Sequence, residues 1–305
     1  MNLSRRTVLA GAGAAAVAAG GTGLASSASA QTAPRFSLGY APHEGSFASR
    51  GNRLEQIAYA ADQGFTAWED NEAAGRSVEE QAAMARALQQ RGMTMGVFVA
   101  SMPRWAEFRP LLGGNDNGDR DAFLSDIRAS IDVARRLDAK WMTVVPGFLD
   151  RKLPVEIQTG RVIDTMRRAA EIVEPHGLVM VMEPLNTLTD HPGVFLQTVP
   201  QGFAVAKAVN SPAVKVLADL YHEQIQAGNL IRTLETCWDE IAYLQFGDNP
   251  GRKEPGTGEI NYRNVVRWLR ARNFAGVIGM EHGNSVEGRT GEDRLVAAYR
   301  EIDAA

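Results

Sequence analysis

Short apolar runs with β-strand preference alternate with longer amphipathic stretches along residues 31–305. Several of the runs lack polar alternation, as is typical of parallel strands that are buried on both faces. Strands that alternate with helices predict a parallel sheet with crossover connections, and therefore an α/β protein. The runs that predict strands are Phe36–Ala41, Thr66–Glu69, Thr94–Ala100, Trp141–Val145, Val179–Glu183, Val214–Asp219, Ile241–Phe246 and Val277–Glu281.

The stretches between these runs have the features of helices. Ser77 is placed to cap a helix, with Glu80 at the capping-box position. Residues Arg161–Val173 and Tyr262–Arg272 have similar amphipathic character. Eight strands and a similar number of helices, without a charged linker, indicate one domain.

Residues 31–305 have about the usual length of a (β/α)8 TIM barrel. An open, doubly wound sheet is the competing architecture. No Gly-x-Gly-x-x-Gly turn follows the first run, although a dinucleotide site in such a sheet normally needs one. The sequence therefore predicts an α/β fold, a (β/α)8 TIM barrel, as a single domain after a cleaved signal peptide.

Residues 1–30 predict a twin-arginine signal peptide. Arg5 and Arg6 precede an apolar stretch rich in Ala and Gly, and Ala28–Ala30 provides a small-residue cleavage site before Gln31. An uncleaved membrane anchor is the alternative, but the apolar stretch is too short and too rich in Gly for a good spanning helix. The expectation is export by the twin-arginine pathway to the periplasm, with no stable membrane insertion after cleavage.

Overall charge and cysteine content narrow the classes of function. The net charge of −4 gives no basic footprint for nucleic acid. Cys237 is the only cysteine, so an intramolecular disulfide is excluded. Its position at a predicted helix end before the seventh strand favours a packed, inert thiol over a catalytic one.

Four polar side chains end the last four predicted strands: Glu183, Asp219, Gln245 and Glu281. The carboxyl ends of barrel strands form the active-site face, so these side chains are expected to converge, which indicates an enzyme. Three carboxylates and one amide oxygen suit Mg²⁺ or Mn²⁺ better than Zn²⁺ or copper. Without a cation the carboxylates would repel one another and raise at least one pKa. The alternative is that they cap helices or pair with basic residues.

Two further residues are candidates for binding substrate. His222 comes three residues after Asp219, within reach of a ligand at the strand ends. Arg252 lies in the turn-rich loop after the seventh strand, where its planar guanidinium could hold a carboxylate or an oxyanion. The alternatives are a satisfied core histidine and a solvated surface loop.

Four segments resemble hydroxypyruvate isomerases, which belong to the xylose isomerase-like TIM-barrel superfamily: Glu183–Asn186, Asp219–His222, Asp248–Tyr262 and Gly279–Glu281. The stretch Glu254–Tyr262 is the most specific of these, and the resemblance covers essentially all of residues 31–305. It implies that Glu183 and Glu281 are the acid/base pair, with Asp219 and Gln245 completing the metal site.

The expected reaction is an isomerisation through an enediol, in which one carboxylate removes a proton beside a carbonyl and another returns it to the neighbouring carbon. The small-molecule carbonyl substrate implied by the resemblance is hydroxypyruvate, with 2-hydroxy-3-oxopropanoate as product. A ketose or keto-inositol epimerase or isomerase, or a non-catalytic periplasmic sugar-binding barrel, are the alternatives. The sequence is compatible with assembly of the chain into a homo-oligomer.

Overall fold

The computed structural model describes residues 33–305. The predicted signal peptide and its cleavage site lie outside the described residues. Within the described part of the chain, no helix combines the length and the apolar character needed to cross a membrane.

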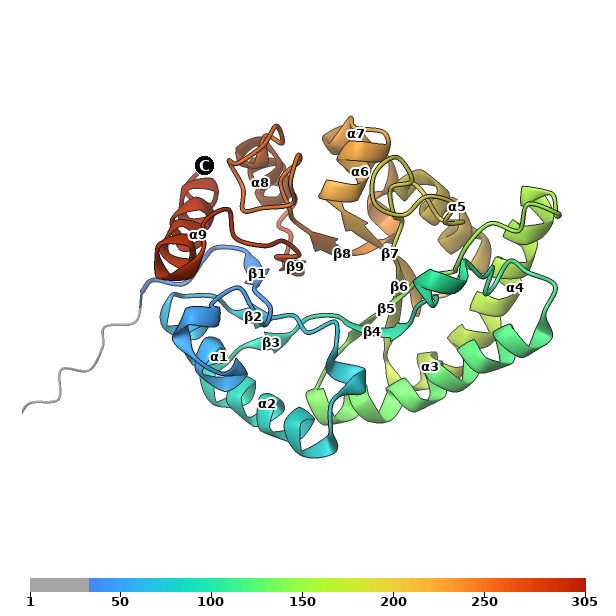
Figure 1. Cartoon of the computed structure of the whole chain (residues 1–305), viewed down its shortest axis with the longest axis horizontal. Helices are drawn as coiled ribbons and strands as arrows, with labels where there is room; N and C mark the ends of the chain where they lie inside the picture. The colour runs from blue at the N-terminus through green and yellow to red at the C-terminus, as the bar shows by residue number, and fades with distance from the viewer. Residues whose placement is uncertain (1–32) are drawn as a thin grey trace, which may run out of the picture. The chain divides into compact units, whose positions relative to one another are not determined.

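The strands form a parallel barrel, which confirms the predicted fold (Figure 1). A seven-stranded sheet has the order β1-β9-β8-β7-β6-β5-β4, and β2 pairs with β3. Every described ladder is parallel. The strands are β1 (Gly39–Ala41), β2 (Ala67–Trp68), β3 (Thr94–Met95), β4 (Phe98–Ser101), β5 (Trp141–Val144), β6 (Val179–Met182), β7 (Val214–Asp219), β8 (Ile241–Gln245) and β9 (Val277–Gly279).

The ring closes between β1 and β2. A parallel bridge joins His43 to Glu69, and the Glu69 N–H donates to the Pro42 carbonyl at 2.9 Å. The predicted strand Thr94–Ala100 is split into β3 and β4, so that β3 pairs with β2 while β4 pairs with β5. Eight strand positions thus close on themselves, which excludes the open, doubly wound sheet.

Helices surround the strands, as the crossover connections of parallel strands require (Figure 1). The capping box of Ser77 and Glu80 is present at the start of α2, which confirms that prediction. The helices are α1 (Arg53–Asp62), α2 (Val78–Arg91), α3 (Asn117–Leu137), α4 (Val155–Val173), α5 (Val199–Val209), α6 (Leu220–Gln226), α7 (Leu230–Cys237), α8 (Tyr262–Ala271) and α9 (Gly288–Asp303).

Apolar side chains pack between the strands and the surrounding helices. Met180, Val216 and Leu244, on three neighbouring strands, are fully buried in this core. Cys237 ends α7 and is 1% exposed, which confirms the prediction of a packed cysteine, and burial raises the pKa of its thiol. The core therefore holds the strand ends in fixed positions, on which the site is built.

Candidate active site

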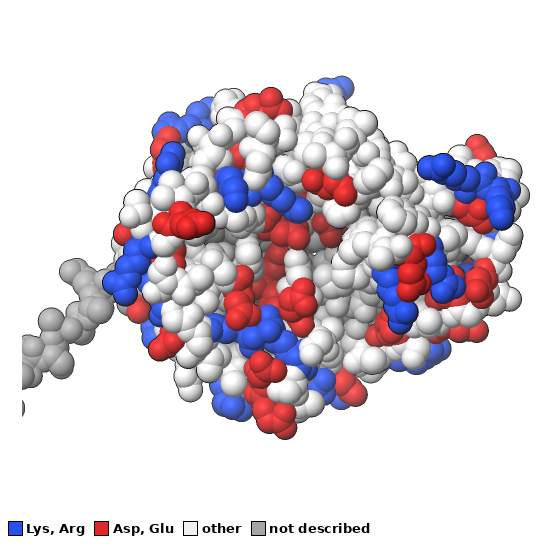
Figure 2. All heavy atoms as spheres, viewed as in Figure 1, with Lys and Arg blue, Asp and Glu red and all other residues white. Residues whose placement is uncertain are grey.

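The predicted side chains lie at the carboxyl ends of four neighbouring strands. Asp219 and Gln245 end β7 and β8 and are partners in the parallel ladder. Glu183 directly follows β6, and Glu281 lies two residues after the end of β9. A cavity of about 630 Å³ opens there, and Glu183 and Glu281 both line it. Figure 2 shows acidic side chains at the bottom of a central hollow with basic side chains near its rim. The structure thus brings the four strand ends together.

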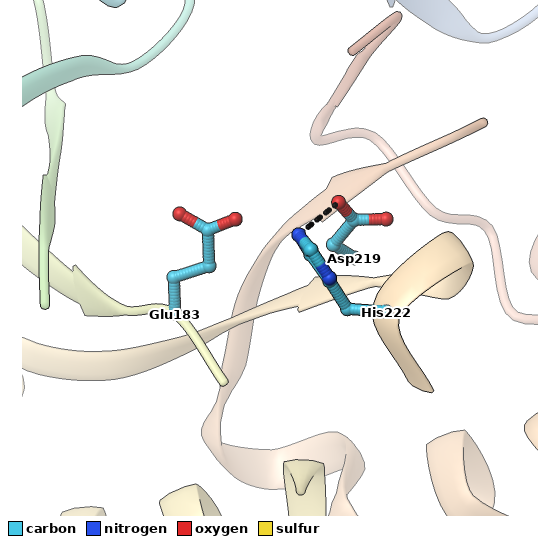
Figure 3. A group of neighbouring side chains, drawn as sticks. All are labelled: Glu183, Asp219 and His222. Atoms are coloured by element: carbon cyan, nitrogen blue, oxygen red, sulfur yellow. Dashed lines mark ion pairs between the residues drawn. The ribbon is translucent and has the colours of Figure 1, made fainter. Parts of the chain in front are cut away.

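Glu183, Asp219 and His222 form a compact group in which one ligand atom of each lies within 4.8 Å of the others (Figure 3). The His222 Nε2 lies 3.7 Å from the Asp219 Oδ2. Burial holds the pKa of His222 well below its usual value, so the ring is neutral near pH 7. A neutral ring carries its proton on either Nδ1 or Nε2.

Asn186 fixes the tautomer of His222. The Asn186 Oδ1 accepts from the N–H groups of Thr189 and Asp190, so its Nδ2 must be the group that faces the histidine. That Nδ2 lies 2.7 Å from the His222 Nδ1 and can only donate. The Nδ1 is therefore the acceptor, and the proton is on Nε2. His222 presents an N–H donor to the site, which suits contact with a substrate oxygen better than metal ligation.

Arg252 lies between two of the predicted ligands. Its Nη2 is 2.6 Å from the Asp219 Oδ2 and 2.9 Å from the Glu281 Oε2, and its guanidinium stacks 4.8 Å from the centre of the Tyr221 ring. The Arg252 Nε donates to the Glu281 carbonyl at 3.0 Å. Arg252 therefore lines the cavity, as expected of a substrate-binding residue, and it also neutralises carboxylate charge.

The loop that carries Arg252 is organised by Asp248, which is fully buried. The Asp248 Oδ1 accepts from the N–H groups of Asn249 and Ile260, and its Oδ2 accepts from those of Gly256 and Gly258. One carboxylate thus binds four backbone N–H groups of this loop. The stretch that most resembles the isomerase family accordingly acts as a scaffold for Arg252.

Arg252 itself has a φ of 51°, in the left-handed region that residues with side chains seldom adopt. Because such a conformation costs energy, the surrounding loop must impose it. The scaffold around Asp248 and the ion pairs of the guanidinium provide that constraint.

Several site residues were not predicted. Glu69 follows β2 and accepts from the Tyr243 hydroxyl and the Gln245 Nε2, both at 2.9 Å. The Asn71 Nδ2 donates to the Glu281 Oε1 at 3.2 Å, and the ring of His191 lines the cavity. Glu69 carries the same signal as the predicted acids, a carboxylate directly after a buried strand. His191 lies in a long loop and has no such signal.

The carboxyl groups of the site have perturbed acidities. Burial is the largest cause that raises the pKa of each of them above its usual value: Glu69, Glu183, Asp219 and Glu281. Repulsion by neighbouring carboxylates raises it further for Glu69, Glu183 and Glu281. Arg252 opposes the rise for Glu183, Asp219 and Glu281. One guanidinium faces several buried carboxyl groups, so another positive charge would be needed to keep them all ionised.

The residues present fit a divalent cation. Glu183 and Asp219 have carboxylate oxygens within 4.8 Å of each other, and Glu281 lines the same cavity as Glu183. The Gln245 Oε1 is buried and has no hydrogen-bond partner among the described residues, so it is available as a fourth oxygen. A donor set of oxygens alone suits hard cations.

Comparison with known proteins places this site in context. The family model described as xylose isomerase-like TIM barrel matches residues 57–302. Hydroxypyruvate isomerase of Escherichia coli (strain K12) is 30% identical over 165 residues, 54% of this chain and 64% of that protein. The chain thus spans just under two thirds of the length of that relative.

Two further relatives cover more of the chain. The 2-oxo-tetronate isomerase of Cupriavidus necator is 29% identical over 230 residues, 75% of this chain and 86% of that protein. The crystal structure of an AP endonuclease, family 2, from Brucella melitensis superposes with a TM-score of 0.74 at 27% identity, covering 87% of this chain and 98% of that one.

Proposed function

Because the chain belongs to the xylose isomerase-like TIM-barrel family, we propose that it is an isomerase that moves a carbonyl group between neighbouring carbons of a small hydroxy-carbonyl substrate. The observation that carries this proposal is that Glu183 and Glu281, from non-adjacent strands of the barrel, line one cavity. Two carboxyl groups on a shared cavity can exchange a proton with a substrate between them. The isomerase names of two relatives support the same reaction class.

In the proposed reaction, one of the two glutamates takes the proton from the carbon beside the carbonyl, which leaves an enediolate. The other glutamate delivers a proton to the former carbonyl carbon. The hydroxyl proton passes to the other oxygen, so that the carbonyl and hydroxyl exchange places. The Nε2–H of His222 donates to a substrate oxygen on which negative charge develops, and Arg252 adds positive charge beside it.

We further propose that Glu183, Asp219, Gln245 and Glu281 hold a divalent cation, with Mg²⁺ or Mn²⁺ expected from the all-oxygen donor set. Such an ion supplies positive charge that stabilises an enediolate. The raised pKa values of Glu183 and Glu281 support this proposal, because a cation would offset the repulsion between the buried carboxyl groups.

Hydroxypyruvate is the proposed substrate and 2-hydroxy-3-oxopropanoate the product. A ketose or keto-sugar is the second candidate, because a cavity of about 630 Å³ is roomy for a three-carbon acid. The test is a screen of residues 31–305 against hydroxypyruvate, 2-oxo-tetronate, tetroses, pentoses and hexoses, with Mg²⁺, Mn²⁺ or EDTA. Turnover of none of them, together with binding of a sugar, would favour the non-catalytic binding barrel.

Asp219→Ala is expected to remove the bound cation. Asp219 is 2% exposed, and one of its carboxylate oxygens lies within 4.8 Å of a carboxylate oxygen of Glu183. Elemental analysis of protein purified without chelator should give about one divalent ion per wild-type chain and almost none in the variant. The control is Asp164→Ala, which removes a 56% exposed carboxylate on α4. Full occupancy in Asp219→Ala would show that the ligand assignment is wrong.

For the N-terminal segment, we propose export through the twin-arginine pathway to the periplasm. Replacing Arg5 and Arg6 by Lys is expected to leave the precursor in the cytoplasm, because the pathway reads the two arginines. Cell fractionation measures the distribution, and N-terminal sequencing of the exported protein should begin at about Gln31. Unchanged export of the double variant, or a mature start far from Gln31, would contradict the proposal.

A further inference from the structure

Glu69 is a buried carboxyl group behind the side chains that line the cavity. It is 1% exposed, and its two oxygens face different partners. The Oε1 accepts from the Gln245 Nε2 and the Oε2 accepts from the Tyr243 hydroxyl, both at 2.9 Å. These contacts place it one hydrogen bond behind a predicted ligand.

Gly279 makes room for this arrangement. A Cβ at this position would lie 1.9 Å from the Glu69 Oε2 and 2.9 Å from the Gln245 Cγ. Gly279 is also the ladder partner of Gln245 on β9. The missing side chain lets Glu69 reach across the barrel interior to the end of β8.

The contact with Glu69 decides which way the Gln245 amide points. The Gln245 Nε2 lies 2.9 Å from the Glu69 Oε1, and an ionised Glu69, the form that a bound cation favours, can only accept there. The Gln245 Oε1 is then turned away, buried and without a partner among the described residues. Buried acceptors in folded proteins normally have a partner, so an unpaired one at a strand end is a place for a ligand.

We propose that Glu69 is a positioning residue that orients the Gln245 amide with its oxygen free for a divalent cation and its NH₂ turned away. This inference rests on the cation site proposed above. Tyr243 completes the arrangement: the Val97 N–H donates to its hydroxyl at 3.4 Å, and the hydroxyl donates in turn to Glu69. Partners that orient metal ligands in this way commonly set affinity 10–100-fold.

The test is Glu69→Gln, which keeps the size of the side chain. The Tyr243 hydroxyl then donates to the oxygen of the new amide, whose NH₂ turns toward Gln245. Two NH₂ groups cannot bond each other, so Gln245 must flip and direct its own NH₂ toward the cation. The expected result is a Kd for Mn²⁺ about 10–100-fold weaker than that of wild type, measured by electron paramagnetic resonance without substrate.

Exchanging the two residues distinguishes a loss of the Gln245 amide orientation from a general disturbance of the site. Gln245→Glu alone places two carboxylates in contact at the position of a 2.9 Å hydrogen bond, and it is expected to perturb the site. In the double variant Glu69→Gln/Gln245→Glu, the amide at position 69 accepts from Tyr243 and donates to the new carboxylate. The other oxygen of the carboxylate at position 245 then faces the cation, so Mn²⁺ should bind more tightly than in either single variant. If Glu69→Gln does not fold, the Mn²⁺ affinities of Gln245→Glu and of the double variant still test whether residue 69 orients residue 245.

Glu292→Gln is the matched control, since Glu292 is also a buried carboxylate, 2% exposed, but it pairs with Arg50 and with none of the proposed ligands. It should leave the Mn²⁺ affinity within about twofold of wild type, a much smaller change than the 10–100-fold loss expected for Glu69→Gln. Wild-type affinity in Glu69→Gln, a swap no better than Gln245→Glu, or a wild-type protein that binds no Mn²⁺ would each overturn the inference. Because Mn²⁺ binding is measured without substrate, a failure to isomerise hydroxypyruvate would refute only the proposed reaction.

Discussion

Glu183→Gln and Glu281→Gln are each expected to lower kcat by roughly 10²–10⁴-fold, the usual contribution of a positioned acid or base. The proposed reaction needs one carboxyl group to take a proton and another to return it. Glutamine keeps the size of the side chain and an oxygen for a cation, but it cannot transfer the proton. The loss should therefore appear in turnover while the fold and the bound metal are retained.

Proton exchange is the more direct measurement. Wild-type protein in deuterium oxide should exchange the hydrogen on the substrate carbon beside the carbonyl, and a variant without the base should not. Glu171→Gln, on the exposed face of α4, is the control and should leave both rates unchanged. Near-normal turnover and exchange in either site variant would exclude the mechanism with two carboxylates and favour the binding barrel.

Asp248→Asn is expected to destabilise the protein by about 2–6 kcal/mol, because two of the four N–H groups bound by this buried carboxylate would face an NH₂ group and each unsatisfied donor costs about 1–3 kcal/mol. Asparagine has the same shape, so packing is preserved. Arg252 sits on the same loop and would lose its support, so kcat should fall as well. Urea unfolding and steady-state kinetics measure the two effects.

Asp116→Asn provides the comparison. Asp116 also accepts a hydrogen bond from a backbone N–H, that of Gly118, but it caps the exposed start of α3. Water can satisfy the donor there, so the loss of stability should be much smaller. Equal losses in the two variants would show that the network around Asp248 does not organise the loop.

The barrel and the grouping of its strand ends could be predicted from the order of residues along the chain. The eight strand runs were recognised because buried parallel strands are apolar and short, and each lies within a few residues of its predicted position. Glu183, Asp219, Gln245 and Glu281 could be expected together because consecutive barrel strands are neighbours and their carboxyl ends share one face. The apolar pattern of the strands and the spacing of the residues that end them are thus enough to predict the barrel and its active-site face.

The hydrogen-bond partners of these side chains could not be predicted, because they come from segments that are distant in the sequence. The hydrogen bond between Glu69 and Gln245 joins residues 176 positions apart in the sequence, and the one between Arg252 and Asp219 joins residues 33 positions apart. Neither the amide orientation of Gln245 nor the tautomer of His222 has a local signal, because each depends on which donor or acceptor faces it. Hydrogen bonds between distant segments fix such details, and these bonds exist only after the barrel has closed and excluded water from its interior.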